Sequence, residues 1–183
     1  HLDEYCDSVK NGEYQNSGIE NRLTPVFHEL YGKTFGIVGL GNIGRQVARI
    51  AEAFGCNVLC FKRTPDPNYC CVDLETLLKN ADIVTLHLPL NDQTEKIIGE
   101  KELSLMKPNA ILVNVSRGAV TDEKAVAEAL KNHTIGGFAT DVYSVEPMEN
   151  ISPLNEIKDF ENVLLTPHMA WGAYESRIRC INE

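Results

Sequence analysis

The 183-residue sequence predicts an α/β fold, with a doubly wound parallel β-sheet that carries helices on both faces. Three observations support this prediction. Short apolar runs lack the polar alternation of half-exposed strands, which is typical of strands buried on both sides. Segments with apolar residues at helical spacing follow most of these runs. A GxGxxG string joins the first run to the first such helix.

Composition limits the classes of function. The sequence has 17 Lys and Arg against 26 Asp and Glu, and the net charge of −9 argues against nucleic acid or an anionic membrane as partner. No apolar run approaches the roughly 18–20 residues of a membrane span, and the N-terminus lacks the features of a signal peptide. The six cysteines show no CxxC spacing, so we expect free structural thiols, no metal site and a cytoplasmic location.

Residues 1–32 differ from the rest of the sequence. They are polar, contain the string NGEYQNSG and include Pro25, which breaks a long helix. The first ten or so residues are predicted to form a short helix and the remainder an extended linker. The sequence starts without a methionine, and we expect it to be a piece of a longer protein.

Regular elements are expected from Lys33 onward. Strands are predicted at 34–40 and 57–61, with a helix at 43–54 between them that ends at Gly55. The apolar residues of this helix recur at helical spacing: Ile43, Val47, Ile50, Ala51 and Phe54. A short helix is expected after Asp73, whose side chain suits an N-cap.

The same alternation continues to the end of the sequence. Further strands are predicted at 82–88, 110–115, 136–142 and 162–166. Further helices are predicted at 100–106, at 121–132 and from residue 173 onward. The helix at 121–132 starts with Thr121 as the expected cap, followed by acidic residues that suit a helix N-terminus.

The GxGxxG string is Gly39-Leu40-Gly41-Asn42-Ile43-Gly44, between a predicted strand and a predicted helix. Gly39 permits a tight turn, Gly41 allows the backbone to approach a pyrophosphate, and Gly44 allows close helix–strand packing. Phosphates then face the amides at the helix N-terminus. In this context the string predicts dinucleotide binding; by itself it is also compatible with a glycine turn that binds nothing.

The end of the second strand bears on the choice between NAD and NADP. NAD-specific domains keep an acidic residue there for the ribose hydroxyls, but this sequence has Lys62 and Arg63. A basic pair would neutralise a 2′-phosphate, so the sequence favours NADP slightly over NAD. The alternative is that both residues are solvated turn charges, with Asp66 close by.

Three further segments follow strands and are expected to face the same crevice, because ligands of open parallel sheets bind outside the carboxyl ends of the strands. They bring Arg117, Glu146 and His168 to the cofactor. Arg117 suits the carboxylate and carbonyl of a 2-oxo acid. His168 suits proton transfer, and Glu146 suits the other ring nitrogen of that histidine. Taken singly, an arginine or a histidine is more often structural than catalytic.

The remaining histidines are weaker candidates. His87 is expected beside the cofactor cleft, whereas His1, His28 and His133 are expected at the surface or in the linker.

In this order and spacing, the strings GLGNIG, HLPL, VNVSRGAV, DVYSVEP and TPHMAW resemble the D-isomer-specific 2-hydroxyacid dehydrogenases over nearly the whole sequence. The resemblance implies that Arg117, Glu146 and His168 are the catalytic residues. It implies a Rossmann cofactor domain at 33–172, with 1–32 as the inter-domain linker or helix and 173–183 as the start of a C-terminal return helix. The cofactor-binding residues that motif and resemblance together predict are Gly39, Gly41, Asn42, Ile43, Gly44, Lys62, Arg63, Leu88, Pro89, Thr94, Val115, Ser116, Arg117, Asp141, His168 and Ala170.

The segment PHMAW, with Trp171, is similar to the glycerate dehydrogenase or hydroxypyruvate reductase branch. The resemblance therefore implies oxidation of D-glycerate, or reduction of hydroxypyruvate or glyoxylate, and a homodimer. It also implies that a second, substrate-binding domain is missing from this sequence, so we expect weak activity from this piece alone.

Two other functions stay open. One is a corepressor-like protein that senses NAD(H) without metabolic turnover, since such proteins resemble the family and can keep the same three residues. The other is a different Rossmann enzyme such as an adenosylhomocysteine hydrolase, for which the spacing of the three segments is wrong.

Overall fold

The computed structural model describes residues 2–182 and divides the chain into two compact units, one ending at Leu30 and one beginning at Tyr31. The first unit contains α1 (Leu2–Lys10) and α2 (Glu13–Asn16), followed by irregular chain. The Tyr5 hydroxyl donates to the Pro25 carbonyl at 2.6 Å and so ties α1 to this irregular segment. The predicted short N-terminal helix is confirmed, and α2 is an addition to the prediction.

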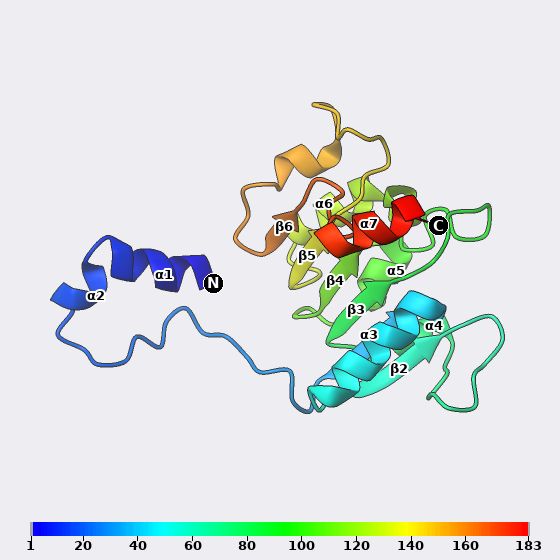
Figure 1. Cartoon of the computed structure of the whole chain (residues 1–183), viewed down its shortest axis with the longest axis horizontal. Helices are drawn as coiled ribbons and strands as arrows, with labels where there is room; N and C mark the ends of the chain where they lie inside the picture. Colours follow the sequence, from blue (N-terminus) through cyan, green and yellow to red (C-terminus); the bar gives the residue numbers. More distant parts are fainter. Residues whose placement is uncertain (1, 183) are drawn as a thin grey trace. The chain divides into compact units, whose positions relative to one another are not determined.

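The second unit is built on a six-stranded sheet in the order β2-β1-β3-β4-β5-β6 (Figure 1). All neighbouring strands are parallel. The strands are β1 (Thr34–Val38), β2 (Asn57–Phe61), β3 (Ile83–Leu86), β4 (Ile111–Asn114), β5 (Gly137–Thr140) and β6 (Val163–Leu165). The six predicted strands and the doubly wound α/β fold are therefore confirmed.

The predicted helices of this unit are also present. They are α3 (Asn42–Ala53), α4 (Leu74–Asn80), α5 (Glu100–Leu105), α6 (Glu123–Lys131) and α7 (Tyr174–Asn182). Asp73 caps α4 by accepting from the Thr76 N–H, as expected. The cap of α6 is Asp122 and not Thr121, because the Asp122 carboxylate accepts from the N–H groups of the first turn. Two 3₁₀ turns, η1 (Gly118–Val120) and η2 (Pro153–Glu156), were not predicted.

The main core lies between the sheet and α4, α5 and α6, where side chains such as Leu77, Leu103 and Val126 are buried. On the opposite face α3 packs on β1 and β2 through a smaller cluster around Ile37 and Ala48. Farther along that face Ile111 of β4 and Leu164 of β6 are exposed. Within the second unit, the helical cover is thus complete on one face and partial on the other.

The side of α3 that packs on the sheet differs from the one that its large apolar residues suggest. Gly44, Ala48 and Ala51 are buried, whereas Ile43, Ile50 and Phe54 are 68%, 57% and 59% exposed. The reason is close approach, since a Cβ at Gly44 would lie 2.2 Å from the Gly39 carbonyl oxygen. Small residues therefore face the strand, and the large ones form an outward stripe along the helix.

The strand order places a topological switch between β1 and β3, because the chain passes from β1 to β2 on one side and returns to β3 on the other. Open parallel sheets bind ligands at the carboxyl ends of the strands at such a point. Among residues 2–182, no helix has the length and apolar character that crossing a bilayer needs.

Candidate active site

A cleft of about 680 Å³ lies at the carboxyl ends of β1, β2 and β3. These ends are tied together, because Gly39 N–H donates to the Phe61 carbonyl and His87 N–H donates to the Val38 carbonyl. The cleft is lined by Gly39, Leu40, Gly41, Asn42, Arg45, Phe61, Lys62, Arg63, Thr64, His87, Leu88, Pro89, Asn91, Gln93, Thr94 and Ile97. It therefore opens at the switch point of the sheet.

The three glycines of the GxGxxG string have different environments. Gly39 has a φ of 100°, and a Cβ there would lie 2.6 Å from the His87 carbonyl oxygen. Gly44 is confined by its approach to Gly39. A Cβ at Gly41, by contrast, would meet nothing within 4 Å. Packing within the protein therefore does not require glycine at 41, and the open space there suits close approach of a ligand to the backbone.

The N-terminus of α3 faces the same cleft. Its N-cap is Gly41, and no side chain caps the first-turn amides. Amides in this position and the helix dipole favour a phosphate group. The open space at Gly41 and the two cations after β2 agree with this, so the residues present fit a dinucleotide.

Eight of the predicted cofactor-binding residues line this cleft: Gly39, Gly41, Asn42, Lys62, Arg63, Leu88, Pro89 and Thr94. Gly44 serves the packing of α3, and Ile43 lies on the outward stripe of that helix. Whether each of these residues contacts a bound cofactor stays a prediction.

Arg45, which was not predicted from the sequence, also lines the cleft and forms an ion pair with the buried Asp66 at 2.5 Å. Its signal in the sequence is its position directly after Gly44, in the first turn of the helix. Asp66 further accepts from the Asn68 N–H at 3.1 Å. This bond, and after it the contact with Arg45, lowers the pKa of the Asp66 carboxyl, although burial acts to raise it.

His87 lines the cleft, as expected. Its Nε2 lies 3.1 Å from the Thr85 hydroxyl, and burial lowers the pKa of the imidazole. A neutral ring is therefore favoured at this position.

His168 and Glu146 lie together at the ends of β6 and β5, with 2.6 Å between His168 Nδ1 and Glu146 Oε2. Glu146 Oε1 accepts from the Tyr143 N–H at 3.0 Å. The Tyr143 N–H and then His168 lower the pKa of the Glu146 carboxyl, with a further contribution from the charge of Arg117. His168 has a φ of 51°, which is uncommon outside glycine and often found at functional sites.

Arg117 is exposed at the end of β4, and its guanidinium donates to the Ser116 carbonyl at 2.7 Å. The next residue explains how this segment approaches the Glu146 loop. A Cβ at Gly118 would lie 1.9 Å from the Tyr143 carbonyl carbon and 2.3 Å from the Ser144 nitrogen. Only glycine fits against this peptide bond, so Gly118 brings Arg117 beside the loop that carries Glu146.

The remaining predicted residues have structural partners. Ser116 is buried and donates to Asn114 Oδ1 at 2.9 Å, while Val115 is exposed. The Asp141 carboxylate accepts from Thr166 Oγ1 at 2.6 Å, from Met169 N–H at 2.9 Å and from Ala170 N–H at 2.7 Å. Asp141 thus holds the segment on both sides of His168.

The net effect of this environment is to lower the pKa of Asp141. Burial raises it, but the bonds from Thr166, Ala170 and Met169 outweigh burial, with the charge of His168 adding to them. The carboxylate is therefore the favoured form at neutral pH.

The thiols of Cys6, Cys60, Cys70, Cys71 and Cys180 are free. Burial raises the pKa of the Cys60 thiol to about 12, as suits a small core residue. No group of three or more His, Cys, Asp or Glu side chains suited to a metal ion occurs in the described part of the chain, residues 2–182.

Comparison with known proteins gives a family match over residues 1–170, to the model described as "D-isomer specific 2-hydroxyacid dehydrogenase, NAD binding domain". The chain is 43% identical to a glyoxylate reductase of Thermococcus litoralis over 178 residues, covering 92% of this chain and 52% of that protein. It is 40% identical to a glycerate dehydrogenase of Methylorubrum extorquens over 172 residues, covering 94% and 54%.

Among solved structures, an acyclic imino acid reductase in complex with NADPH and D-Arg superposes with a TM-score of 0.80 at 35% identity, covering 96% of this chain and 56% of that one. The chain thus spans about half the length of the relatives it matches. The fold, the glycine cleft and the family match lead to one conclusion: the chain belongs to the D-isomer-specific 2-hydroxyacid dehydrogenase family and carries its nicotinamide-cofactor-binding domain.

Proposed function

We propose that this chain supplies the cofactor site and the acid–base residues of an oxidoreductase that transfers hydride between a nicotinamide cofactor and a D-2-hydroxy or 2-oxo acid. D-glycerate and hydroxypyruvate, or glyoxylate, are the proposed substrates. The observation that carries the proposal is the 2.6 Å contact between His168 and Glu146, at the same sheet edge as the glycine cleft. The names of the relatives, glyoxylate reductase and glycerate dehydrogenase, support the substrate class.

The roles follow from the chemistry of each group. The bound cofactor supplies or accepts the hydride. His168 gives a proton from Nε2 to the developing alkoxide, or removes it in the oxidative direction. Glu146 accepts from Nδ1 and holds the ring with Nε2 directed away from the carboxylate. Arg117 binds the substrate carboxylate through paired N–H donors.

Turnover and binding measured on the same samples test this proposal. We expect oxidation of NADPH or NADH by hydroxypyruvate and glyoxylate, and a loss of roughly 10²- to 10⁴-fold in His168→Gln. Dinucleotide binding, followed by nicotinamide fluorescence, should stay nearly unchanged in the variant because His168 is not among the residues that line the glycine cleft. Tight dinucleotide binding without turnover in the unsubstituted chain would favour a sensor of NAD(H) over an enzyme.

Within this function we propose a preference for NADPH over NADH, resting on Lys62 and Arg63 at the end of β2. Both residues line the cleft, with Arg45 as a third cation on its wall. A 2′-phosphate adds a charged acceptor that such donors bind well. The solved relative that holds NADPH supports this preference.

We further propose that two copies of the chain associate through the outward stripe of α3. An antiparallel pair of α3 helices around a two-fold axis would pair Ile43 with the partner's Phe54 and Val47 with the partner's Ile50. Three large apolar residues of this stripe, Ile43, Ile50 and Phe54, are more than half exposed, which suits a self-complementary apolar contact. Sedimentation should give a dimer that Ile50→Lys dissociates; a monomeric unsubstituted chain would contradict this.

For the location, we propose the cytoplasm. The exposed thiols of Cys6, Cys70 and Cys180 fit a reducing compartment.

A further inference from the structure

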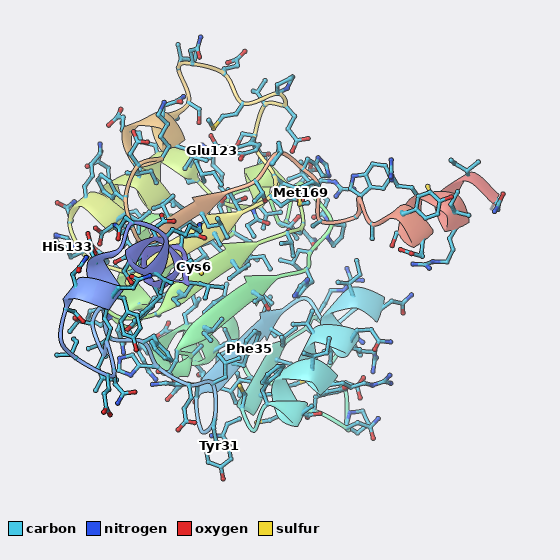
Figure 2. All side chains as sticks on the ribbon, turned by 60° about the vertical axis from the view of Figure 1, so that its left-hand side comes forward. Cys6, Tyr31, Phe35, Glu123, His133 and Met169 are labelled. Atoms are coloured by element: carbon cyan, nitrogen blue, oxygen red, sulfur yellow. The ribbon has the colours of Figure 1, made fainter. Side chains whose placement is uncertain are left out.

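Glu123, the first residue of α6, uses both carboxylate oxygens on a loop that lies far from it in the sequence (labelled in Figure 2). Oε1 accepts from the Ser144 N–H at 2.6 Å, and Oε2 accepts from the Ser152 hydroxyl at 3.0 Å. Ser152 Oγ in turn accepts from the Leu154 N–H and caps η2. One side chain therefore fixes both ends of the segment 144–152.

This segment carries Glu146. Two successive backbone N–H groups donate to different carboxylates: the Tyr143 N–H donates to Glu146, and the Ser144 N–H donates to Glu123. The peptide bond between Tyr143 and Ser144 also packs directly against Gly118. The position of Glu146 relative to His168 thus depends on a peptide that Glu123 holds from one side.

Apolar packing holds this segment at one residue, Met148, which packs against the main core. Near the two ends of the segment, Val145 is 53% exposed and Ile151 is 86% exposed. Hydrogen bonds in which an ionised carboxylate is the acceptor are stronger than hydrogen bonds between two neutral groups. The bonds from Ser144 and Ser152 to Glu123 are therefore a main restraint on where Glu146 lies.

We propose that Glu123 is a positioning residue: by holding the Tyr143–Ser144 peptide it keeps Glu146 Oε2 within hydrogen-bond distance of His168 Nδ1. The geometry of the pair carries this inference, and only its kinetic consequence rests on the proposed function. Glu123 itself bonds to the loop and not to His168, so its effect on the imidazole passes through Glu146.

The test measures which nitrogen of His168 carries the proton in the neutral ring. Two-bond ¹H–¹⁵N NMR spectra of the full chain report this, and His168→Gln identifies the signals. In the unsubstituted chain the Glu146 contact should favour the Nδ1–H form. In Glu123→Ala the majority should move to the Nε2–H form, as it should in Glu146→Ala, which removes the acceptor from Nδ1. The matched control is Glu128→Gln on the same helix, where the carboxylate pairs with Lys131, and it should keep the Nδ1–H form.

Glu123→Gln provides a milder variant in case Glu123→Ala does not fold. It keeps one acceptor oxygen, so it should give a smaller shift in the same direction. An Nδ1–H population in a folded Glu123 variant that equals that of the unsubstituted chain would overturn the proposal.

Kinetics provide a second readout. If Glu123 acts through Glu146, kcat should fall roughly 10- to 100-fold in Glu123→Ala, while the KM for the dinucleotide stays the same. An unchanged kcat in a folded variant would contradict the positioning role. Absence of turnover in the unsubstituted chain would instead count against the proposed function, and the NMR result would still decide the role of Glu123.

Discussion

At the ends of β1, β2 and β3 the cleft presents backbone amides, glycines and cations, whereas at the ends of β4, β5 and β6 side chains bond to neighbouring loops. The first region is built around the string from Gly39 to Gly44 and the pair Lys62–Arg63. In the second, carboxylates of Glu123, Asp141 and Glu146 hold segments that are distant in the sequence, apart from the contact of Glu146 with Tyr143. The cleft is therefore lined by three short segments, 39–45, 61–64 and 87–97, each at the carboxyl end of a strand, whereas the contact between Glu146 and His168 depends on side-chain bonds between distant loops.

Two glycines offer the sharpest contrast between these regions. Gly118→Ala would force a Cβ into the Tyr143–Ser144 peptide, so we expect a loss of roughly 2–3 kcal/mol in the free energy of unfolding. In Gly41→Ala the new Cβ lies in open space, so the free energy of unfolding should fall by about 1 kcal/mol or less. The same Cβ should weaken dinucleotide binding. Urea unfolding together with cofactor titration measures both effects. Equal free energies of unfolding for the two variants would contradict the expected difference between a glycine required by packing and a glycine that faces open space.

Asp141→Asn tests the side-chain bonds of the second region. The amide leaves an N–H donor facing the N–H groups of Met169 or Ala170, so we expect a loss of about 1–3 kcal/mol at pH 7. Because the folded-state pKa of Asp141 is lowered, its ionised form stabilises the fold above the ordinary carboxyl pKa, and this contribution disappears as the pH falls through the folded value.

Denaturant unfolding of the unsubstituted chain and Asp141→Asn, repeated from pH 7 down to pH 3, checks this sign. The difference between the two proteins should shrink toward acid pH. A difference that stays constant or grows would mean that the carboxylate form of Asp141 is not what stabilises the 166–170 segment.

The smallest effect is expected in the first region. Lys62→Ala and Arg63→Ala should each weaken NADPH binding by up to about tenfold, roughly 1.4 kcal/mol, and leave NADH binding nearly unchanged. Fluorescence titration with both cofactors measures this, with Lys79→Ala on α4 as a control that removes a cation paired with Glu75. Equal losses for both cofactors would make the pair general phosphate contacts instead of selectors of NADPH.

The difference between the regions also explains what the sequence could predict. The strands and the glycine string follow from local pattern, and they are confirmed. The outward direction of Ile43, Ile50 and Phe54 was not predictable from spacing alone, because the approach of Gly44 to Gly39 decides which side of α3 faces the sheet.

In the second region the sequence predicted Arg117, Glu146 and His168 as a group, and the structure brings Glu146 and His168 into contact. The bonds from Glu123 and Asp141 to distant loops have no local signature, since an acidic residue in a first helical turn or after a strand has many other uses. Arg45 was missed for a related reason: its position in the cleft depends on the ion pair with Asp66.

The most direct measurement follows the hydride itself. NADPH deuterated at C4 of the nicotinamide, on either face in separate samples, is incubated with this chain and hydroxypyruvate, and glycerate is analysed by NMR and by chiral separation. Long incubation detects even slow turnover. We expect deuterium at C2 of D-glycerate from one of the two samples, with incorporation roughly 10²- to 10⁴-fold slower in His168→Gln. Glycerate without deuterium from either sample, the L-isomer as product, or no product at all would contradict hydride transfer at this site.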